Sequence, residues 1–94
     1  MRNGTVVERE AVVENELGFH ARAAALFVKH AGSFGCEIFV CKNGLEINAK
    51  SIMGILMLAM PRGETFSIRA SGEDAAEAVD ALCDLVKGKF GEPQ

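Results

Sequence analysis

Tryptophan and tyrosine are both absent from this chain of 94 residues, and no run of basic residues occurs in it. Without those two side chains there is little aromatic surface on which nucleotide bases could stack. The formal net charge of −3 also removes the electrostatic attraction on which nucleic-acid binding depends. We therefore expect no nucleic-acid partner, although a mildly acidic protein can still dock on a basic protein surface.

Long apolar segments are lacking as well. The longest, Ile52 to Met60, is far shorter than the roughly 20 apolar residues of a membrane-spanning helix. Residues Met1 to Thr5 show no apolar core of a signal peptide before the first strand-like run begins. These absences predict a cytoplasmic protein with no membrane partner.

Cysteines are few, and their odd number speaks against a disulfide framework. Cys36 and Cys41 lie an odd number of positions apart in one predicted strand, so their side chains point to opposite faces and do not ligate one metal. We interpret these two and Cys83 as reduced thiols that pack like small apolar groups. Neither a metal nor a cofactor is expected.

Hydrophobic residues make up 49% of the chain, which is ample for one core. The length fits a single domain and no more. We expect this domain to span residues 1–94, with residues 91–94 frayed. The pattern leaves open whether Phe90 packs back on the core.

The first half of the chain shows strand and helix patterns in turn. Residues 5–13 are rich in valine and predict a strand, and residues 20–31 predict a helix. Residues 36–42 and 45–49 predict two further strands, joined by Asn43-Gly44, which favours a tight hairpin because both residues accept positive φ. The helix has one apolar stripe at helical spacing: Ala24, Phe27, Val28 and Ala31.

The second half predicts a helix, a strand and a helix. Ser51 begins a short helix that ends before Pro61, and residues 64–71 alternate as a half-buried strand does. Ser71 and Asp74 resemble a capping box at the start of the last helix. The buried side of that helix is expected to consist of four residues: Ala75, Val79, Leu82 and Val86.

The element order βαββαβα, with clean apolar and polar faces on two of the strands, predicts an α+β open-faced β-sandwich. In this fold a four-stranded antiparallel sheet is covered by three helices on one face, and its other face meets water. A ferredoxin-like βαββαβ arrangement gives a similar order of elements, and periodicity alone does not separate the two.

The segment Gly18-Phe19-His20-Ala21-Arg22 places a histidine in the first turn of a helix, with an arginine close behind. The first N–H groups of a helix lack partners and carry partial positive charge, which favours a neutral imidazole and attracts anions. A phosphoryl group accepted by His20 would lie beside those N–H groups and the planar guanidinium of Arg22. Such a transfer needs positioning and charge stabilisation. The alternative is that His20 merely begins a helix, the usual role of a lone histidine there.

The segment Ser51 to Met57 is the second one of interest. Ser51 can cap the short helix through its side-chain oxygen. Apolar residues lie nearly all round this helix, and a helix that covers one sheet cannot bury every side. The exposed part would suit a docking surface on which flexible methionines adapt to several partners. Complete burial in the core is an equally good interpretation of the pattern alone.

Two stretches, residues 18–24 (GFHARAA) and residues 49–56 (AKSIMGIL), together resemble HPr. HPr is the histidine-containing phosphocarrier family of the bacterial phosphoenolpyruvate-dependent phosphotransferase system, the PTS, which serves sugar transport. The likeness covers nearly the whole chain, including the Asn43-Gly44 hairpin and the final helix. Either stretch alone is a weak signal, whereas both in order, in a chain of this size, are a strong one.

The resemblance implies an open-faced β-sandwich and a specific function. Enzyme I would phosphorylate His20 on Nδ1 with a group derived from phosphoenolpyruvate, and Arg22 would bind the phosphoryl oxygens. An EIIA-type domain would then accept the group, so the chain would be a monomeric phosphoprotein that carries phosphate rather than an enzyme. The family's docking surface maps onto residues around the histidine: Phe19, Ala23, Ile52, Met53 and Leu56.

Ser51 matches the serine that an ATP-dependent HPr kinase/phosphorylase modifies in some members of the family. A phosphate at a helix N-terminus is electrostatically tolerated, and its charge would weaken binding of enzyme I. The alternative function is a regulatory binding module that acts through phosphorylated Ser51. A third interpretation is that Ser51 only caps the helix and is not phosphorylated. A small-ligand-binding ferredoxin-like domain ranks below them, because no motif supports it.

Two departures from the family pattern bear on the pathway. Ala23 stands where most HPr sequences have proline, which loosens the constraint on φ in the first turn and leaves the nucleophile and the arginine in place. Asn15 to Gly18, with Leu17 in place of a small polar residue, looks like the nitrogen-related branch, whereas Lys50 to Gly54 looks like the kinase-regulated type. The sequence thus does not choose between sugar uptake and nitrogen or carbon regulation, nor does it identify the acceptor.

Overall fold

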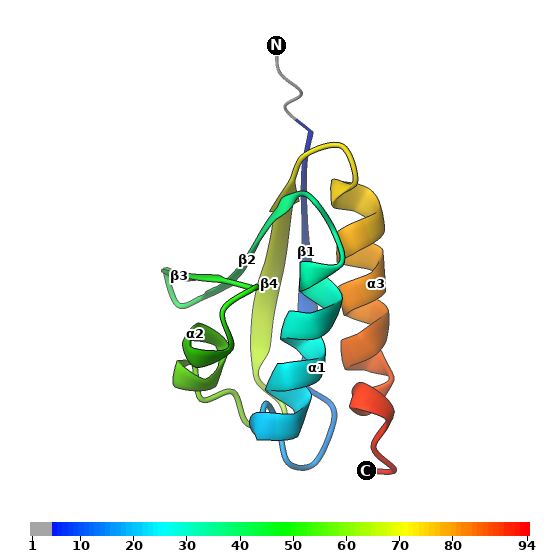
Figure 1. Cartoon of the computed structure of the whole chain (residues 1–94). Helices are drawn as coiled ribbons and strands as arrows, with labels where there is room; N and C mark the ends of the chain where they lie inside the picture. Colours follow the sequence, from blue (N-terminus) through cyan, green and yellow to red (C-terminus); the bar gives the residue numbers. More distant parts are fainter. Residues whose placement is uncertain (1–4) are drawn as a thin grey trace.

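A computed structural model describes residues 5–94 of the protein. The predicted order βαββαβα is confirmed, with a short 3-10 turn, η1, added at its end (Figure 1). Residues 1–4 of the predicted domain lie outside the described residues. The elements are β1 (Val6–Val12), α1 (Ala21–Gly32), β2 (Glu37–Lys42), β3 (Leu45–Asn48), α2 (Ile52–Met57), β4 (Thr65–Ser71), α3 (Ala75–Lys87) and η1 (Lys89–Gly91).

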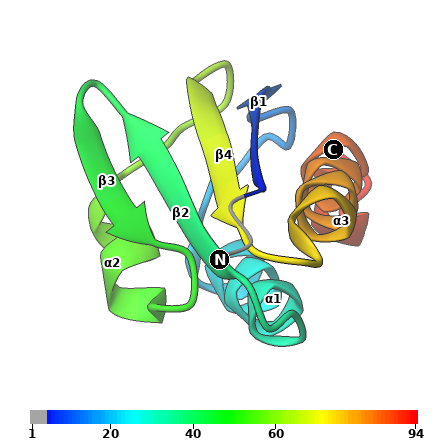
Figure 2. The same cartoon turned by 90° about the horizontal axis from the view of Figure 1, so that it is seen from above.

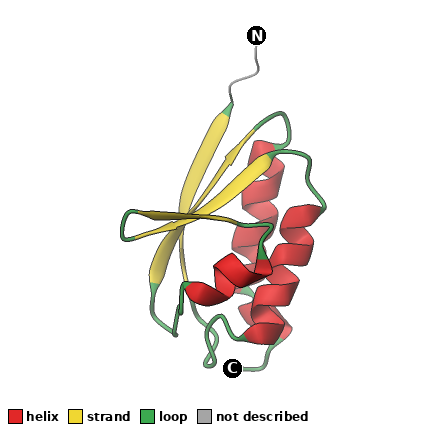
Figure 3. Ribbon diagram, turned by 60° about the vertical axis from the view of Figure 1, so that its left-hand side comes forward, coloured by secondary structure: helices red, strands yellow, loops and turns green. Residues whose placement is uncertain are grey.

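The four strands form one antiparallel sheet in the order β1-β4-β2-β3. The helices pack against one face of the sheet and leave the other face open (Figure 3), and the view from above shows the same two layers (Figure 2). The α+β open-faced β-sandwich is therefore confirmed. β1 lies at an edge of the sheet, whereas a ferredoxin-like sheet holds its first strand inside, so that alternative is excluded.

The hairpin between β2 and β3 turns at Asn43-Gly44, as predicted. Lys42 pairs with Leu45 across the turn, and the two turn residues have φ values of 52° and 80°. Positive φ at both central residues gives the turn the twist of the flanking strands. The pairing register of the hairpin then follows from the turn.

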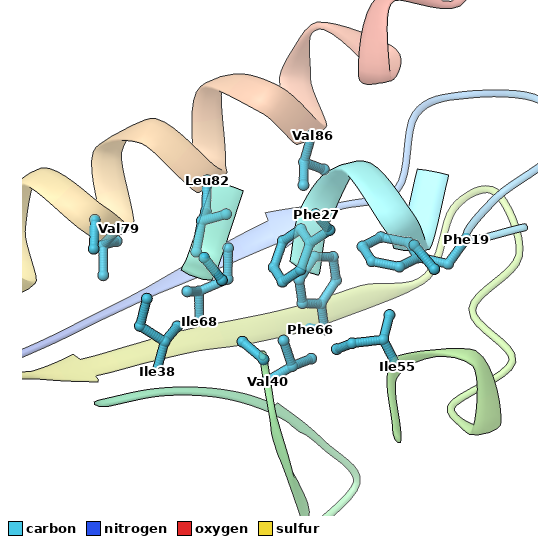
Figure 4. Close-up of a cluster of buried hydrophobic side chains, with 14 of the residues drawn as sticks. Phe19, Phe27, Ile38, Val40, Ile55, Phe66, Ile68, Val79, Leu82 and Val86 are labelled. Carbon is cyan, nitrogen blue, oxygen red and sulfur yellow. The ribbon is translucent and has the colours of Figure 1, made fainter. Parts of the chain in front are cut away.

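The core lies between the sheet and the helices (Figure 4). In β4 the alternation is confirmed, because Phe66, Ile68 and Ala70 are buried. Phe90 on η1 is buried too, so the end of the chain does pack back on the core. The predicted buried side of α3 is likewise confirmed for all four residues: Ala75, Val79, Leu82 and Val86.

The predicted capping box at the start of α3 is wrong. Ser71 belongs to β4, and Asp74 is the N-cap residue but makes no capping bond. Its carboxylate instead accepts the N–H groups of Gly35 and Cys36 over 2.9 and 3.1 Å, so a tertiary contact replaces the local one. Burial, reinforced by Asp74, raises the pKa of the Cys36 thiol to about 11, which keeps this thiol protonated and unreactive near neutral pH.

Candidate functional site

A tight loop presents His20 at the start of α1. Gly18 in this loop has a φ of +68°, and a Cβ on it would come within 2.5 Å of the Met60 carbonyl oxygen. Phe19, the next residue, donates its N–H to the same oxygen over 2.9 Å. Glycine at position 18 is therefore required by both the backbone conformation and the space available.

Phe19 anchors this loop in the core. The family resemblance implied Phe19 and Ala23 as docking residues; both side chains are buried, and their docking role stays a prediction. They face the same interior as the apolar stripe of α1 and so position His20, while Phe19 also lines the hollow beside His20. The Phe19 ring makes edge-on contacts with the rings of Phe27 and Phe66, at centroid distances of 5.3 and 5.5 Å (Figure 4). It also contacts the ring of Phe90 at 5.1 Å.

His20 is the N-cap residue of α1, one position before the first helical residue. Its backbone is extended, and its carbonyl oxygen accepts the N–H of Ala24 over 2.9 Å. The predicted position of the imidazole at the helix N-terminus is thus confirmed, although its side chain makes no capping bond. The imidazole is 27% exposed, and its Nε2 lies 2.5 Å from Oε2 of Glu92.

Glu92 completes the site from the other end of the chain. Its Oε2 also accepts from Nη1 of Arg22 over 3.1 Å, and its Oε1 accepts from Nδ2 of Asn15 over 3.1 Å. Burial by itself would raise the pKa of Glu92, but hydrogen bonds from His20 and Asn15 and the charges of His20 and Arg22 hold it below its ordinary value. Imidazole, guanidinium and carboxylate therefore form one hydrogen-bonded cluster.

The sequence predicted His20 and Arg22 but not Asn15 or Glu92. Glu92 lies 72 positions from His20, in a segment with no periodicity, so no local pattern indicates their contact. Asn15 is completely buried, and its Nδ2 also donates to the Gly18 carbonyl over 2.7 Å. An asparagine three positions before a loop glycine is the only sequence signal of this role.

Residues 91–94 run alongside the loop that holds His20. The N–H of Glu16 donates to the carbonyl oxygen of Gln94 over 3.0 Å, and the Glu92 side chain is only 12% exposed. The end of the chain lies close to the start of α1 in Figures 1 and 3. The expected fraying of this segment stays a prediction.

Four exposed apolar side chains on α2 form a surface that we call the α2 patch: Ile52, Met53, Leu56 and Met57. Met53 is 67% exposed and Met57 79%, while Ile55 on the same helix is buried. Of the two interpretations of this helix, partial exposure is thus the correct one. A shallow hollow connects His20 with the segment that follows α2, and its other lining residues are Leu17, Phe19, Ala59, Met60 and Pro61.

Ser51 is the N-cap residue of α2, as predicted. Its Oγ accepts the N–H of Gly54 over 3.2 Å, and its side chain is half-buried. The hydroxyl therefore lies at the start of the helix that carries the α2 patch.

Two structural findings concern membranes and metals. None of the helices formed by residues 5–94 has the length and apolar character that crossing a bilayer requires. Within the same residues, no group of three or more histidine, cysteine, aspartate or glutamate side chains is arranged to hold a metal ion.

Comparison with known proteins gives consistent matches. The family described as "PTS HPr component phosphorylation site" matches residues 7–88. The phosphocarrier protein HPr of Cupriavidus necator is 41% identical over 93% of this chain and 98% of its own length. The HPr-like protein Crh of Halalkalibacterium halodurans is 43% identical over 87% of this chain and 98% of its own length. The phosphocarrier protein NPr of Shewanella violacea is 40% identical over 94% of this chain and 97% of its own length.

Solved structures agree with these matches. A crystal structure of HPr from Thermoanaerobacter tengcongensis superimposes with a TM-score of 0.90 at 44% identity, over 94% of this chain and 99% of that one. A crystal structure of an HPr dimer from the same organism superimposes with a TM-score of 0.75 at 43% identity, over 98% of this chain and 100% of that one. Because a relative has been crystallised as a dimer, the monomeric state of this chain stays a prediction.

Replacing Gly18 with alanine should destabilise the protein and displace His20. The strained φ and the contact with the Met60 oxygen should together lower the free energy of unfolding by about 2–4 kcal/mol in a urea titration. Gly44→Ala is the matched control, because Gly44 also has positive φ but no atom lies within 4 Å of the added Cβ. That variant should lose only about 1 kcal/mol. Equal losses in the two variants would contradict the importance of the Gly18–Met60 contact.

Proposed function

The chain belongs to the HPr family of PTS phosphocarrier proteins, and we propose that it acts in the cytoplasm as a carrier between two other proteins. Enzyme I transfers to His20 a phosphoryl group derived from phosphoenolpyruvate, and an EIIA-type domain accepts it. The observation that supports this proposal best is the part-exposed imidazole of His20 at the N-terminus of α1, with the guanidinium of Arg22 close by.

The chemistry of the transfer uses groups that the site holds. Nδ1 of a neutral His20 attacks the phosphorus atom, and the phosphoryl oxygens then lie near the first N–H groups of α1, which lack intrahelical partners. Arg22 is 57% exposed, so its planar fork can turn toward two oxygens of the incoming group. The phosphoramidate so formed is labile, which suits a protein that passes the group on.

We assign partner docking to the α2 patch. Exposed apolar patches rimmed by polar groups mark interaction surfaces, and the two methionines can adapt to partners of different shape. The hollow beside His20 is lined by Ala59, Met60 and Pro61, which closely follow the helix that carries the patch. Of the family's docking positions, Ile52, Met53 and Leu56 are the exposed ones.

Regulation through Ser51 is the finer part of the proposal. An ATP-dependent HPr kinase would replace the Gly54 hydrogen bond of Ser51 with a phosphate at the start of α2. The added charge would lie beside the apolar α2 patch, where a partner has to exclude water. Phosphorylation of Ser51 would thus weaken docking without touching His20. A binding module that acts through phosphorylated Ser51 would use the same position.

Incubation with purified enzyme I and phosphoenolpyruvate should load one phosphoryl group, which acid removes and alkali spares. His20→Ala should take up none, because the acceptor nitrogen is gone. His30→Ala is the matched control, since His30 lies in the last turn of α1 and bonds only to that helix, and it should load normally. Loading of His20→Ala from phosphoenolpyruvate would show that the site is elsewhere.

Met53→Asp should raise the KM for phosphorylated enzyme I about tenfold, as loss of one good interface contact does. The free energy of unfolding should change little because Met53 is largely exposed. Leu45→Asp is the control, since Leu45 is 56% exposed on the β2–β3 hairpin, outside the patch. A similar rise in KM for both variants would contradict docking on the α2 patch.

Purified HPr kinase and ATP should place an acid-stable, alkali-labile phosphate on this chain, and Ser51→Ala should remove it. Ser33→Ala, at the end of α1, is the control and should still be modified. The phosphorylated protein should receive a phosphoryl group from enzyme I about tenfold more slowly, because the new charge opposes apolar docking. An unchanged rate would contradict the regulatory role of Ser51.

A further inference from the structure

The carboxylate of Glu92 contacts the nitrogen of the His20 ring that the proposed transfer does not use. Nε2 lies 2.5 Å from Oε2 of Glu92, and Arg22 donates to the same oxygen over 3.1 Å. Glu92 is therefore placed to act on the protons of His20 rather than on an incoming phosphorus atom.

The position of this carboxylate is determined by several contacts. Phe90, two residues earlier, is buried in the core. Asn15, itself completely buried, donates to Oε1 of Glu92 over 3.1 Å and to the Gly18 carbonyl over 2.7 Å, which ties the carboxylate to the loop that presents His20. Glu92 is thus built into the site and does not meet His20 as a free surface side chain.

The charge of Glu92 determines which ring nitrogen of His20 carries the proton. Hydrogen bonds from His20 and Asn15 outweigh the effect of burial and lower the pKa of Glu92, so the carboxylate is ionised at neutral pH. An ionised carboxylate only accepts hydrogen bonds. Nε2 of His20 must therefore be the donor, and in the neutral ring the lone pair is on Nδ1.

We propose that Glu92 is a positioning residue for phosphoryl transfer, which holds His20 in the tautomer with a nucleophilic Nδ1 and stabilises the cation that forms when Nδ1 is phosphorylated. The inference rests on the proposed function, since it concerns how that same histidine reacts. A carboxylate that orients a histidine through its second nitrogen is an arrangement known from metal sites and hydrolases.

The protons balance without an outside base. The lone pair of Nδ1 forms the new bond to phosphorus while the bond from phosphorus to the donor atom breaks, and the electron pair of the broken bond stays with the donor. The His20 ring then holds the phosphoryl group on Nδ1 and the proton on Nε2, so it is positively charged beside the negative Glu92. When the acceptor takes the group, the electron pair of the broken bond returns to Nδ1 and the neutral tautomer is restored.

The test uses Glu92→Gln in the full chain, with Glu73→Gln as the charge-matched control. Glutamine keeps the shape of glutamate, but its amide can donate as well as accept and so no longer selects a tautomer. Glu73 is exposed and lies just before α3, outside the His20 cluster. Urea titration of all three proteins checks that they are equally folded.

The first measurement is the ¹⁵N chemical shift of both ring nitrogens of His20, in protein labelled on histidine and at a pH where the ring is neutral. The unmodified protein and Glu73→Gln should show a proton on Nε2, and Glu92→Gln should show a mixture of tautomers. His30 is an internal reference, because its Nδ1 lies 2.9 Å from the Leu26 carbonyl and must donate there. The signals of His30 should not change in any variant.

The second measurement is the rate of phosphoryl transfer from phosphorylated enzyme I. Glu92→Gln should be slower by about tenfold or more, the usual effect of removing a group that orients a histidine, and Glu73→Gln should match the unmodified protein. An unchanged tautomer in Glu92→Gln overturns the proposal, and so does a changed tautomer with an unchanged rate. If the unmodified protein accepts no phosphoryl group at all, the proposed function fails, which the tautomer measurement distinguishes from a failure of the Glu92 assignment.

Discussion

The position of His20 depends on the contact between the Gly18 loop and the Met60 carbonyl oxygen. Loops are the mobile parts of a fold, yet this one is held by a hydrogen bond from Phe19 and by the burial of the Phe19 ring. Because Met60 closely follows α2, the same contact couples the imidazole to the helix that bears the α2 patch. A partner that docks on the patch, as proposed above, would therefore meet the histidine in one fixed geometry.

Most of the fold was predictable because its elements have strong local patterns. The period of two in β4, the apolar stripe of α1 and the Asn43-Gly44 turn each depend on neighbours in the sequence. The start of α3 could not be predicted in this way, because Asp74 bonds to the N–H groups of Gly35 and Cys36 from a distant loop. A local rule failed where a tertiary partner competed for the same side chain.

Only half of the site was accessible from the sequence. His20 and Arg22 are close in the chain and belong to a motif, whereas Glu92 and Asn15 join them through folding alone. Phe19 shows a different limit. A motif indicates that a position matters, but it does not tell whether the side chain faces a partner or the core.

The separation of His20 and Glu92 along the chain has a consequence for protein synthesis. The ribosome makes the segment that contains His20 long before it makes Glu92, which follows 72 residues later. During that interval the imidazole lacks the carboxylate that, as proposed, keeps its proton on Nε2. If Glu92 positions His20 as proposed, a chain that lacks the segment after α3 would present the imidazole without its counter-charge.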